Sequence, residues 1–267
     1  AGVAVAHIHG GDRAEGIADE AMRHAITKLA HLHLPATEMS AARIRRMGER
    51  PDDVIVIGSP AIDGLSEIPP IDDDALEKYA GVRECPGALV LLHPAGRDDA
   101  TEAAAARSVI DGVRHAGAGT VVALQPNHDA GRHAVLAELQ AARDNGEVVA
   151  IVPNMPRALF VGLLKRMATH NGVLVGNSSA ALIEAAAVPI AAVDVGPRQA
   201  GRERAGNVVH AADETAAAIA AAVQRAREMQ LDGVHPYGDG VAGMRAAEAI
   251  AARDAQDAGM LRKRFVD

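Results

Sequence analysis

The chain has 267 residues, of which 49% are hydrophobic, and its formal net charge is −8. It contains two Phe, two Tyr and no Trp, so the core must be built from aliphatic side chains, and stacking platforms for single-stranded nucleic acid are not expected. The negative charge also repels phosphate backbones. Any phosphate that the protein binds must therefore be held by local contacts.

Cys85 is the only cysteine, which excludes an internal disulfide and indicates a reducing, cytoplasmic location. No apolar run approaches the ~20 residues that span a bilayer, and no signal segment is recognisable. We therefore expect a cytoplasmic protein with no membrane partner.

The first 66 residues alternate between β and α patterns. Residues 3–8 form a β-like run, a helical pattern extends from about 17 to 31, and a second apolar run spans residues 31–36. Thr37 is predicted to cap the next helix, and residues 54–57 are expected to form a third strand. This order is typical of a parallel sheet.

A stretch rich in Pro and Asp opens an expected linker over residues 67–84. The pattern then restarts, with helical segments between apolar strands predicted at residues 88–92, 120–124, 148–152, 173–175 and 190–195. Five such alternations predict a doubly wound domain over residues 85–230. Two Ala-rich helices, at 215–230 and 241–255, complete the pattern, the second within a C-terminal segment of residues 231–267.

The expected fold class is therefore α/β, with two Rossmann-like doubly wound domains. Such a sheet has five or six strands, whereas residues 1–66 supply about three. We expect the N-terminal domain to be incomplete in this chain, with apolar sheet surface that is exposed or covered by a partner.

The stretch VGNSSAALIEAAAVPI, residues 175–190, carries the most specific chemistry. A helix that begins near Ser178, directly after a parallel strand, would direct its positive end and its backbone N–H groups at an anion. The hydroxyls of Ser178 and Ser179 would donate to phosphate, and Glu184 would accept from ribose hydroxyls. The stretch predicts a nucleotide site, although Asn177 or Ser178 acting only as a helix cap remains an alternative.

Polar residues also follow two other predicted strands. His93 comes after residues 88–92, and Asn127 lies in the PNHDAG stretch after residues 120–124. Open α/β sheets bind ligands at the carboxyl ends of their strands, so these polar residues predict one shared site.

The HIHGGD stretch, residues 7–12, leads into a helix with Asp19 and Arg23. Asp12 and Asp19 are candidates for proton transfer at a sugar carbon, with Arg23 holding a phosphate or a carboxylate. Asp19 and Arg23 are also four residues apart, so a simple ion pair on one helix face is the alternative. The His-x-His pairs at 7/9 and 31/33 lack a further ligand that would complete a zinc site, so neither a metal nor a cofactor is expected.

Eight motifs in order resemble the UDP-N-acetylglucosamine 2-epimerase family over nearly the whole chain: HIHGGD, DEAMRHAITKLAHLHLPATE, VIGSPAID, HPAG, PNHDAG, VGNSSAALIEAAAVPI, GPRQAGRERAGNVV and HPYGDGVAGMR. The chain is most similar to the hydrolysing, sialic-acid-pathway branch. The resemblance implies a two-domain, glycosyltransferase-B-like fold with the active site between the domains. It also implies a C-terminal helix that returns to the N-terminal domain from residues 235–240. The resemblance further implies a homo-oligomer, either a dimer or a tetramer, and an incomplete sheet would increase the need for one.

By resemblance, Ser178 and Ser179 hold the diphosphate, Glu184 the ribose and His93 a phosphate oxygen. Arg198 in the GPRQ stretch matches a nucleotide-sugar contact. The expected catalytic residues are Asp12, Asp19 and His93, and the expected UDP-binding set also includes Arg23 and Asn127. The implied reaction removes the C2 proton as UDP leaves C1, and water then adds to the glycal.

Two departures from the family pattern keep other functions open. His9 stands where many relatives carry glutamate, and the family's first sheet strand and an upstream catalytic aspartate have no counterpart in this sequence. The alternatives are a non-hydrolysing epimerase, a bacillosamine-type substrate, a UDP-binding fragment with impaired catalysis and, without sequence support, a glycosyltransferase.

Overall fold

The structure, a computed structural model, describes residues 3–13, 19–254 and 261–263. It divides into unit 1, residues 1–64 with 236–267, and unit 2, residues 65–235. Each unit has its own sheet and its own hydrophobic core. Within the described residues, no helix has the length and apolar character needed to span a bilayer.

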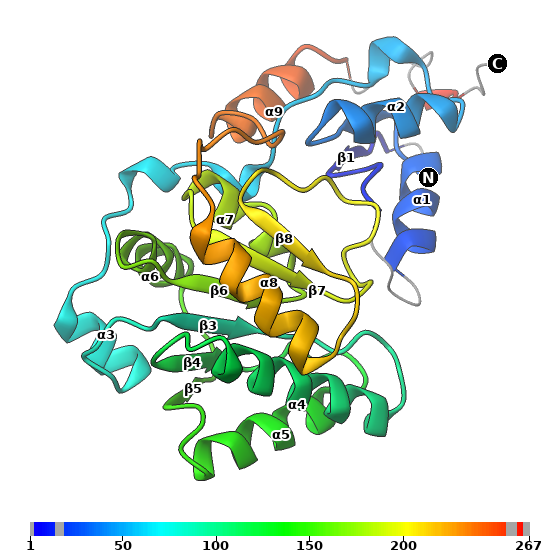
Figure 1. The fold of residues 1–267 in the computed structure, drawn as a ribbon. Coiled ribbons are helices and arrows are strands. Elements are labelled where there is room, and N and C mark those ends of the chain that lie inside the picture. Colours follow the sequence, from blue (N-terminus) through cyan, green and yellow to red (C-terminus); the bar gives the residue numbers. More distant parts are fainter. Residues whose placement is uncertain (1–2, 14–18, 255–260, 264–267) are drawn as a thin grey trace. The chain divides into compact units, whose positions relative to one another are not determined.

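Unit 2 is built on a parallel sheet, shown in teal to yellow in Figure 1. Its strands, as far as the structure describes the chain, are β3 (Ala88–Leu91), β4 (Val121–Leu124), β5 (Ala150–Val152), β6 (Val173–Gly176), β7 (Ala191–Val195) and β8 (Val208–Ala211). Their order across the sheet is β5-β4-β3-β6-β7-β8. The chain runs from β3 to one edge, then returns and builds the other edge from β6. This order confirms the predicted doubly wound fold.

Helices cover both faces of this sheet. Over one face lie α4 (Asp99–His115), α5 (Arg132–Asp144) and α8 (Ala216–Glu228) (Figure 1). The connection from β5 to β6 passes through α6 (Arg157–Thr169), and a right-handed crossover in that direction places α6 on the opposite face. The core is aliphatic, as predicted, with Val, Ala, Leu and Ile from the strands packed against helix residues such as Val109, Leu139 and Val223.

The five strands predicted for unit 2 are all present, because buried parallel strands read as continuous apolar runs. The sixth strand, β8, was not predicted, and its four residues VVHA are mostly half-buried at the sheet edge. The predicted linker contains helix α3 (Asp73–Ala80). The Asp72 side chain accepts a hydrogen bond from Ala75 N at its start, and Gly81, at a φ of 68°, ends it.

Unit 1 contains, among its described residues, a parallel pair formed by β1 (Ala6–Ile8) and β2 (Leu32–Leu34). The strand predicted at residues 54–57 is wrong, since only an isolated bridge joins Val54 to His33. Ile55 N and Ile57 N donate to His33 O and Pro35 O, at 2.9 and 3.1 Å. Pro35 has no backbone N–H with which to donate the next hydrogen bond of the ladder, so the pairing stops there.

The helices described in unit 1 pack around this short sheet. Thr37 caps α2 (Glu38–Arg46), as predicted, by accepting a hydrogen bond from Ser40 N. Buried alanines of α9 (Ala242–Ala251) pack against Leu32, Leu34 and Ile57. Unit 1 also contains α1 (Asp19–Leu29) and the 3₁₀ turns Pro51–Asp53 and Pro60–Ile62. The short elements of unit 2 are α7 (Glu184–Ala187) and the 3₁₀ turns Leu65–Glu67 and Ser179–Ala181.

Candidate functional site

The strand order of unit 2 reverses between β3 and β6, which places a ligand crevice at their carboxyl ends. His93 follows β3 there, and Asn177 follows β6. Gly176, the last residue of β6, has a φ of 151°, and a Cβ atom at this position would lie 2.0 Å from Leu91 O. Only glycine lets the two strand ends approach so closely.

The ring of His93 has a defined tautomer. Its Nδ1 accepts the backbone N–H of Asn127 at 3.1 Å, so in the neutral imidazole the proton is on Nε2. Burial, reinforced by the charge of Arg198 and opposed by that of Asp129, lowers the pKa of His93 from 6.5 to about 4. At neutral pH, His93 therefore offers one uncharged N–H donor.

A pocket of about 460 Å³ opens beside His93 within unit 2. Three residues predicted for the site line it together: His93, Asn127 and Glu184. The other lining residues come mainly from the segments after β4 and β5 and from α6: Leu91, Leu124, Gln125, Pro126, His128, Arg132, Pro153, Asn154, Met155, Arg157, Phe160 and Ala180. The pocket thus combines apolar walls with a few polar groups, as small-molecule sites do.

The helix expected to begin at Ser178 is wrong. The chain forms a 3₁₀ turn, Ser179–Ala181, followed by the four-residue helix α7, which is too short for a useful dipole. Ser178 is 8% exposed and its hydroxyl accepts the N–H of Ala180 at 3.3 Å, so it caps this turn. Ser179 is partly exposed, and Glu184 opens α7 beside the pocket.

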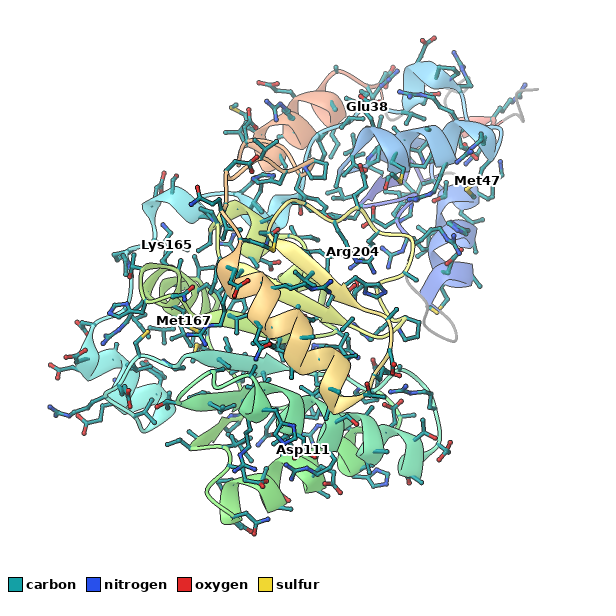
Figure 2. All side chains as sticks on the ribbon, in the orientation of Figure 1. Glu38, Met47, Asp111, Lys165, Met167 and Arg204 are labelled. Carbon is teal, nitrogen blue, oxygen red and sulfur yellow. The ribbon has the colours of Figure 1, made fainter. Side chains whose placement is uncertain are left out.

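Arg198 lies next to this edge of the sheet. Its Nη1 donates to Asn177 O at 3.1 Å, and its Nη2 is 3.8 Å from Asp129 Oδ2. Further along the same loop, Arg204, labelled in Figure 2, donates from Nε and Nη2 to the fully buried Asp194 at 2.9 and 2.6 Å. Burial raises the pKa of Asp194, and Arg204 opposes that rise. This ion pair anchors the loop that carries Arg198.

The other predicted site residues belong to unit 1. Asp12 is 5% exposed, accepts a hydrogen bond from Ser40 Oγ at 2.8 Å and lies 3.1 Å from His9 Nδ1. His9 Nε2 is in turn 2.9 Å from Ser59 Oγ. Arg23 donates to His9 O at 3.4 Å. Asp19 is the first residue of α1, and its side chain lies outside the described part of the chain.

The two His-x-His pairs have separate partners. His7 Nδ1 lies 3.2 Å from Thr27 Oγ1, and burial lowers the pKa of His7 to about 4. His33 is 1% exposed and its Nε2 lies 3.0 Å from Glu49 Oε2. Within the described residues, no three His, Cys, Asp or Glu side chains form a group suited to a metal ion.

Known proteins are similar to this chain in sequence and in fold. A protein from Legionella pneumophila named UDP-N,N'-diacetylbacillosamine 2-epimerase (hydrolyzing) is 32% identical over 240 residues, which are 89% of this chain and 62% of that protein. A UDP-N-acetylglucosamine 2-epimerase from Neisseria meningitidis is 30% identical over 79% of this chain and 54% of its own length. The chain thus spans about three-fifths of the first relative and about half of the second.

The solved structures agree in fold. The crystal structure of UDP-GlcNAc 2-epimerase from Neisseria meningitidis, determined with UDP-GlcNAc bound, matches with a TM-score of 0.75 at 17% identity, over 94% of this chain and 70% of that chain. The family model described as UDP-N-acetylglucosamine 2-epimerase matches residues 1–251. These matches confirm the resemblance predicted from the eight motifs, and the chain belongs to the UDP-N-acetylglucosamine 2-epimerase family.

Proposed function

We propose that the protein is a hydrolysing UDP-N-acetylglucosamine 2-epimerase, which converts UDP-N-acetylglucosamine and water to UDP and N-acetylmannosamine. The observation that carries the proposal is the pocket at the strand-order reversal, where the neutral donor His93 meets Asn127 and Glu184. The name of the Legionella relative, which specifies a hydrolysing 2-epimerase, supports the hydrolysing outcome.

In this proposal the nucleotide occupies the pocket of unit 2. The Nε2–H of His93, the hydroxyls of Ser178 and Ser179 and the guanidinium of Arg198 hold the diphosphate. The carboxylate of Glu184 accepts hydrogen bonds from the ribose hydroxyls, and Asn127 completes the polar wall beside His93. The N-terminus of α7 contributes nothing, because the helix has only four residues.

The diphosphate contacts are also part of the chemistry. A base removes the C2 proton of the sugar, the electron pair forms the C1=C2 bond of a glycal, and UDP leaves C1 with the bonding electrons. Water then adds across this bond, with hydroxide at C1 and a proton at C2 on the opposite face. Because the C2 proton is weakly acidic, donors that stabilise the departing UDP lower the barrier of the elimination.

Asp12, Asp19 and Arg23 of unit 1 are the proposed proton-transfer and anion-binding groups. Asp12 has the better-defined setting, since the hydroxyl of Ser40 fixes one oxygen and the His9 ring lies beside the other. A carboxylate held this way can take a proton, and the His9–Ser59 contact extends the path.

The assembly, pathway and location also belong to the proposal. Met22, Ile26 and Leu29 lie on one face of α1 and are 60%, 42% and 71% exposed, which supports a homo-oligomer. Amino-sugar biosynthesis of the sialic-acid type is supported by a 26% identical Escherichia coli relative named polysialic acid biosynthesis protein P7. The free thiol of Cys85 supports a cytoplasmic location.

The test is to incubate the protein with UDP-N-acetylglucosamine and to follow the products by NMR. Free UDP together with N-acetylmannosamine would support the proposal. UDP-N-acetylmannosamine would show a non-hydrolysing epimerase, and an unchanged sugar with measurable UDP affinity would show a binding protein without catalysis. A parallel incubation with UDP-N,N'-diacetylbacillosamine would show which amino sugar the site prefers.

A further inference from the structure

The side chain of Asn177 bridges the two central strands just beyond their last paired residues. Leu91 and Gly176 are the final pair of the β3–β6 register. Past that pair, Asn177 Oδ1 accepts the backbone N–H of His93, and Asn177 Nδ2 donates to the backbone carbonyl of His93, both at 2.8 Å. One amide therefore makes the two bonds that, in a continued parallel ladder, two residues of the neighbouring strand would make.

This amide is buried and has no role as a helix cap. Asn177 is 2% exposed, and its backbone N–H donates to Leu91 O at 3.3 Å. The capping contact at the following 3₁₀ turn comes from Ser178, whose hydroxyl accepts the Ala180 N–H. Of the two residues considered as a cap, Ser178 caps the turn and Asn177 does not, so the two hydrogen bonds of the Asn177 side chain to His93 need another explanation.

The bridge controls where His93 directs its donor. The backbone of His93 is held by Asn177 on one side, and its ring is held by the Asn127 N–H at Nδ1 on the other. With both the backbone and the ring fixed, the direction of the Nε2–H bond is also fixed. A donor aligned in advance stabilises an anion without paying for reorganisation.

Asn177 also contacts Arg198, the cationic group proposed to hold the diphosphate. Its backbone carbonyl accepts hydrogen bonds from Arg198 Nη1 at 3.1 Å and from Gln199 Nε2 at 2.8 Å. The neighbouring Gln199 is 1% exposed, so this end of the 196–206 loop is firmly held against β6. A single residue thus contacts the backbone of His93 and the guanidinium of Arg198, two of the groups proposed to hold the diphosphate.

We propose that Asn177 is a positioning residue of the diphosphate site, which aligns His93 through its side-chain amide and Arg198 through its backbone carbonyl. The identity of the ligand rests on the proposed function, whereas the alignment of His93 does not. Asn177 itself makes no contact with the ligand in this assignment.

Unit 2 offers a matched control in Asn207. This residue is also buried, at 5% exposed, and its Nδ2 donates to the backbone carbonyl of Ile190 at 3.0 Å. Asn207 and Ile190 precede β8 and β7, at the amino ends of those strands and so at the opposite edge of the sheet from the pocket. Replacing it removes a comparable buried amide without touching His93.

The experiment compares Asn177→Leu with Asn207→Leu in the full chain. UDP affinity is measured by calorimetry, the His93 ring by its ¹H–¹⁵N imidazole signals without ligand, and stability by thermal unfolding. Both variants should lose stability, but only Asn177→Leu should shift the His93 signals and weaken UDP binding, by about tenfold or more for loss of the aligned bonds. Equal effects of the two variants on affinity and on the His93 signals would overturn the proposal.

Two further outcomes keep the tests separate. If the wild-type protein does not bind UDP, the proposed function fails, while the His93 signals still decide whether Asn177 aligns the ring. If Asn177→Leu does not fold, Asn177→Asp replaces it, because it keeps the acceptor for the His93 N–H and loses the donor to the His93 carbonyl. Unchanged His93 signals in Asn177→Asp would then contradict the alignment.

Discussion

The backbone N–H of Asn127 donates to Nδ1 of His93 at 3.1 Å, which joins the loops after β4 and β3 and leaves Nε2 of the imidazole as the donor. The same contact disfavours protonation, because Nδ1 of an imidazolium carries a proton and cannot accept. Burial acts in the same direction and is the largest cause of the low pKa, about 4, of His93.

The first prediction concerns stability in mild acid. His93 has a pKa of about 4 when folded and 6.5 as the ordinary value, so between these pH values the unfolded chain binds the proton more readily. The contribution of neutral His93 to the free energy of unfolding is complete above pH 6.5 and is lost as the pH falls towards 4. The free energy of unfolding should therefore fall by about 2 kcal/mol from pH 7 to pH 4.5 through His93 alone.

Urea unfolding of the wild-type protein and of His93→Gln at the two pH values measures this effect. The variant should lose that part of the pH dependence and keep the part due to His7, whose pKa is also lowered to about 4. His133, with a side chain that is 78% exposed, supplies the control His133→Gln. A pH dependence that is identical in wild type and His93→Gln would show that His93 stays accessible to protons when folded.

The polar residues at the carboxyl edge of the unit 2 sheet could be predicted from the sequence, but the hydrogen bonds between them could not. Buried parallel strands are recognisable as apolar runs, so the polar residues after them could be assigned to one edge, and His93, Asn127 and Glu184 do line one pocket. The hydrogen bond between Asn177 and His93 joins residues 84 positions apart, and the sequence around neither residue indicates it. The helix predicted from Ser178 is shorter in the structure and begins later, at Glu184, because Ala-rich residues read as helix whether or not the tertiary fold allows one to extend.

The second prediction concerns the ribose contact. Glu184→Ala should weaken UDP binding by about 1 to 3 kcal/mol, the range for a lost hydrogen bond to a charged group. Inorganic pyrophosphate lacks the ribose, so its affinity should be unchanged or stronger once the negative charge is removed. Calorimetry with both ligands gives the comparison.

Glu138 supplies the control for this variant, because it is half-buried on α5 and is not among the residues that line the pocket. Glu138→Ala should bind both ligands as the wild type does. An equal loss of affinity for UDP and pyrophosphate in Glu184→Ala would show that Glu184 maintains the structure of the site and does not bind the ribose.

The third prediction separates binding from proton transfer. Asp12→Asn keeps the shape of the side chain and an acceptor for the Ser40 hydroxyl, but the amide cannot take a proton. We expect kcat to fall by about 10²- to 10⁴-fold, the usual contribution of a general acid or base, with UDP affinity within about twofold of wild type. Exchange of the C2 proton of the sugar with deuterated solvent should be lost in parallel. Retained exchange would move the base to another residue.

The last prediction concerns a cluster of charges in unit 1, centred on the buried Glu49. This carboxylate is 4% exposed and lies 2.6 Å from Lys28 Nζ and 2.7 Å from Lys263 Nζ. Lys263 also donates to the carbonyls of Thr27 and Ala30, at 2.8 and 2.6 Å, so its ammonium ties residue 263 to the end of α1. Burial alone would raise the pKa of Glu49, and the hydrogen bonds from Lys263 and Lys28 more than offset it.

Lys263→Met should destabilise the chain by about 2 to 4 kcal/mol, because it leaves Glu49 with Lys28 as its remaining close cation and removes both carbonyl contacts. Adding Glu49→Gln should restore part of that loss, since the buried charge is then gone. A double-mutant cycle of urea unfolding measures the coupling, and Arg253→Met, at a half-buried ion pair with Asp53, is the control for loss of a cation near the same terminus. Additive effects of Lys263→Met and Glu49→Gln would mean that the ammonium stabilises unit 1 through the carbonyls and not through the carboxylate.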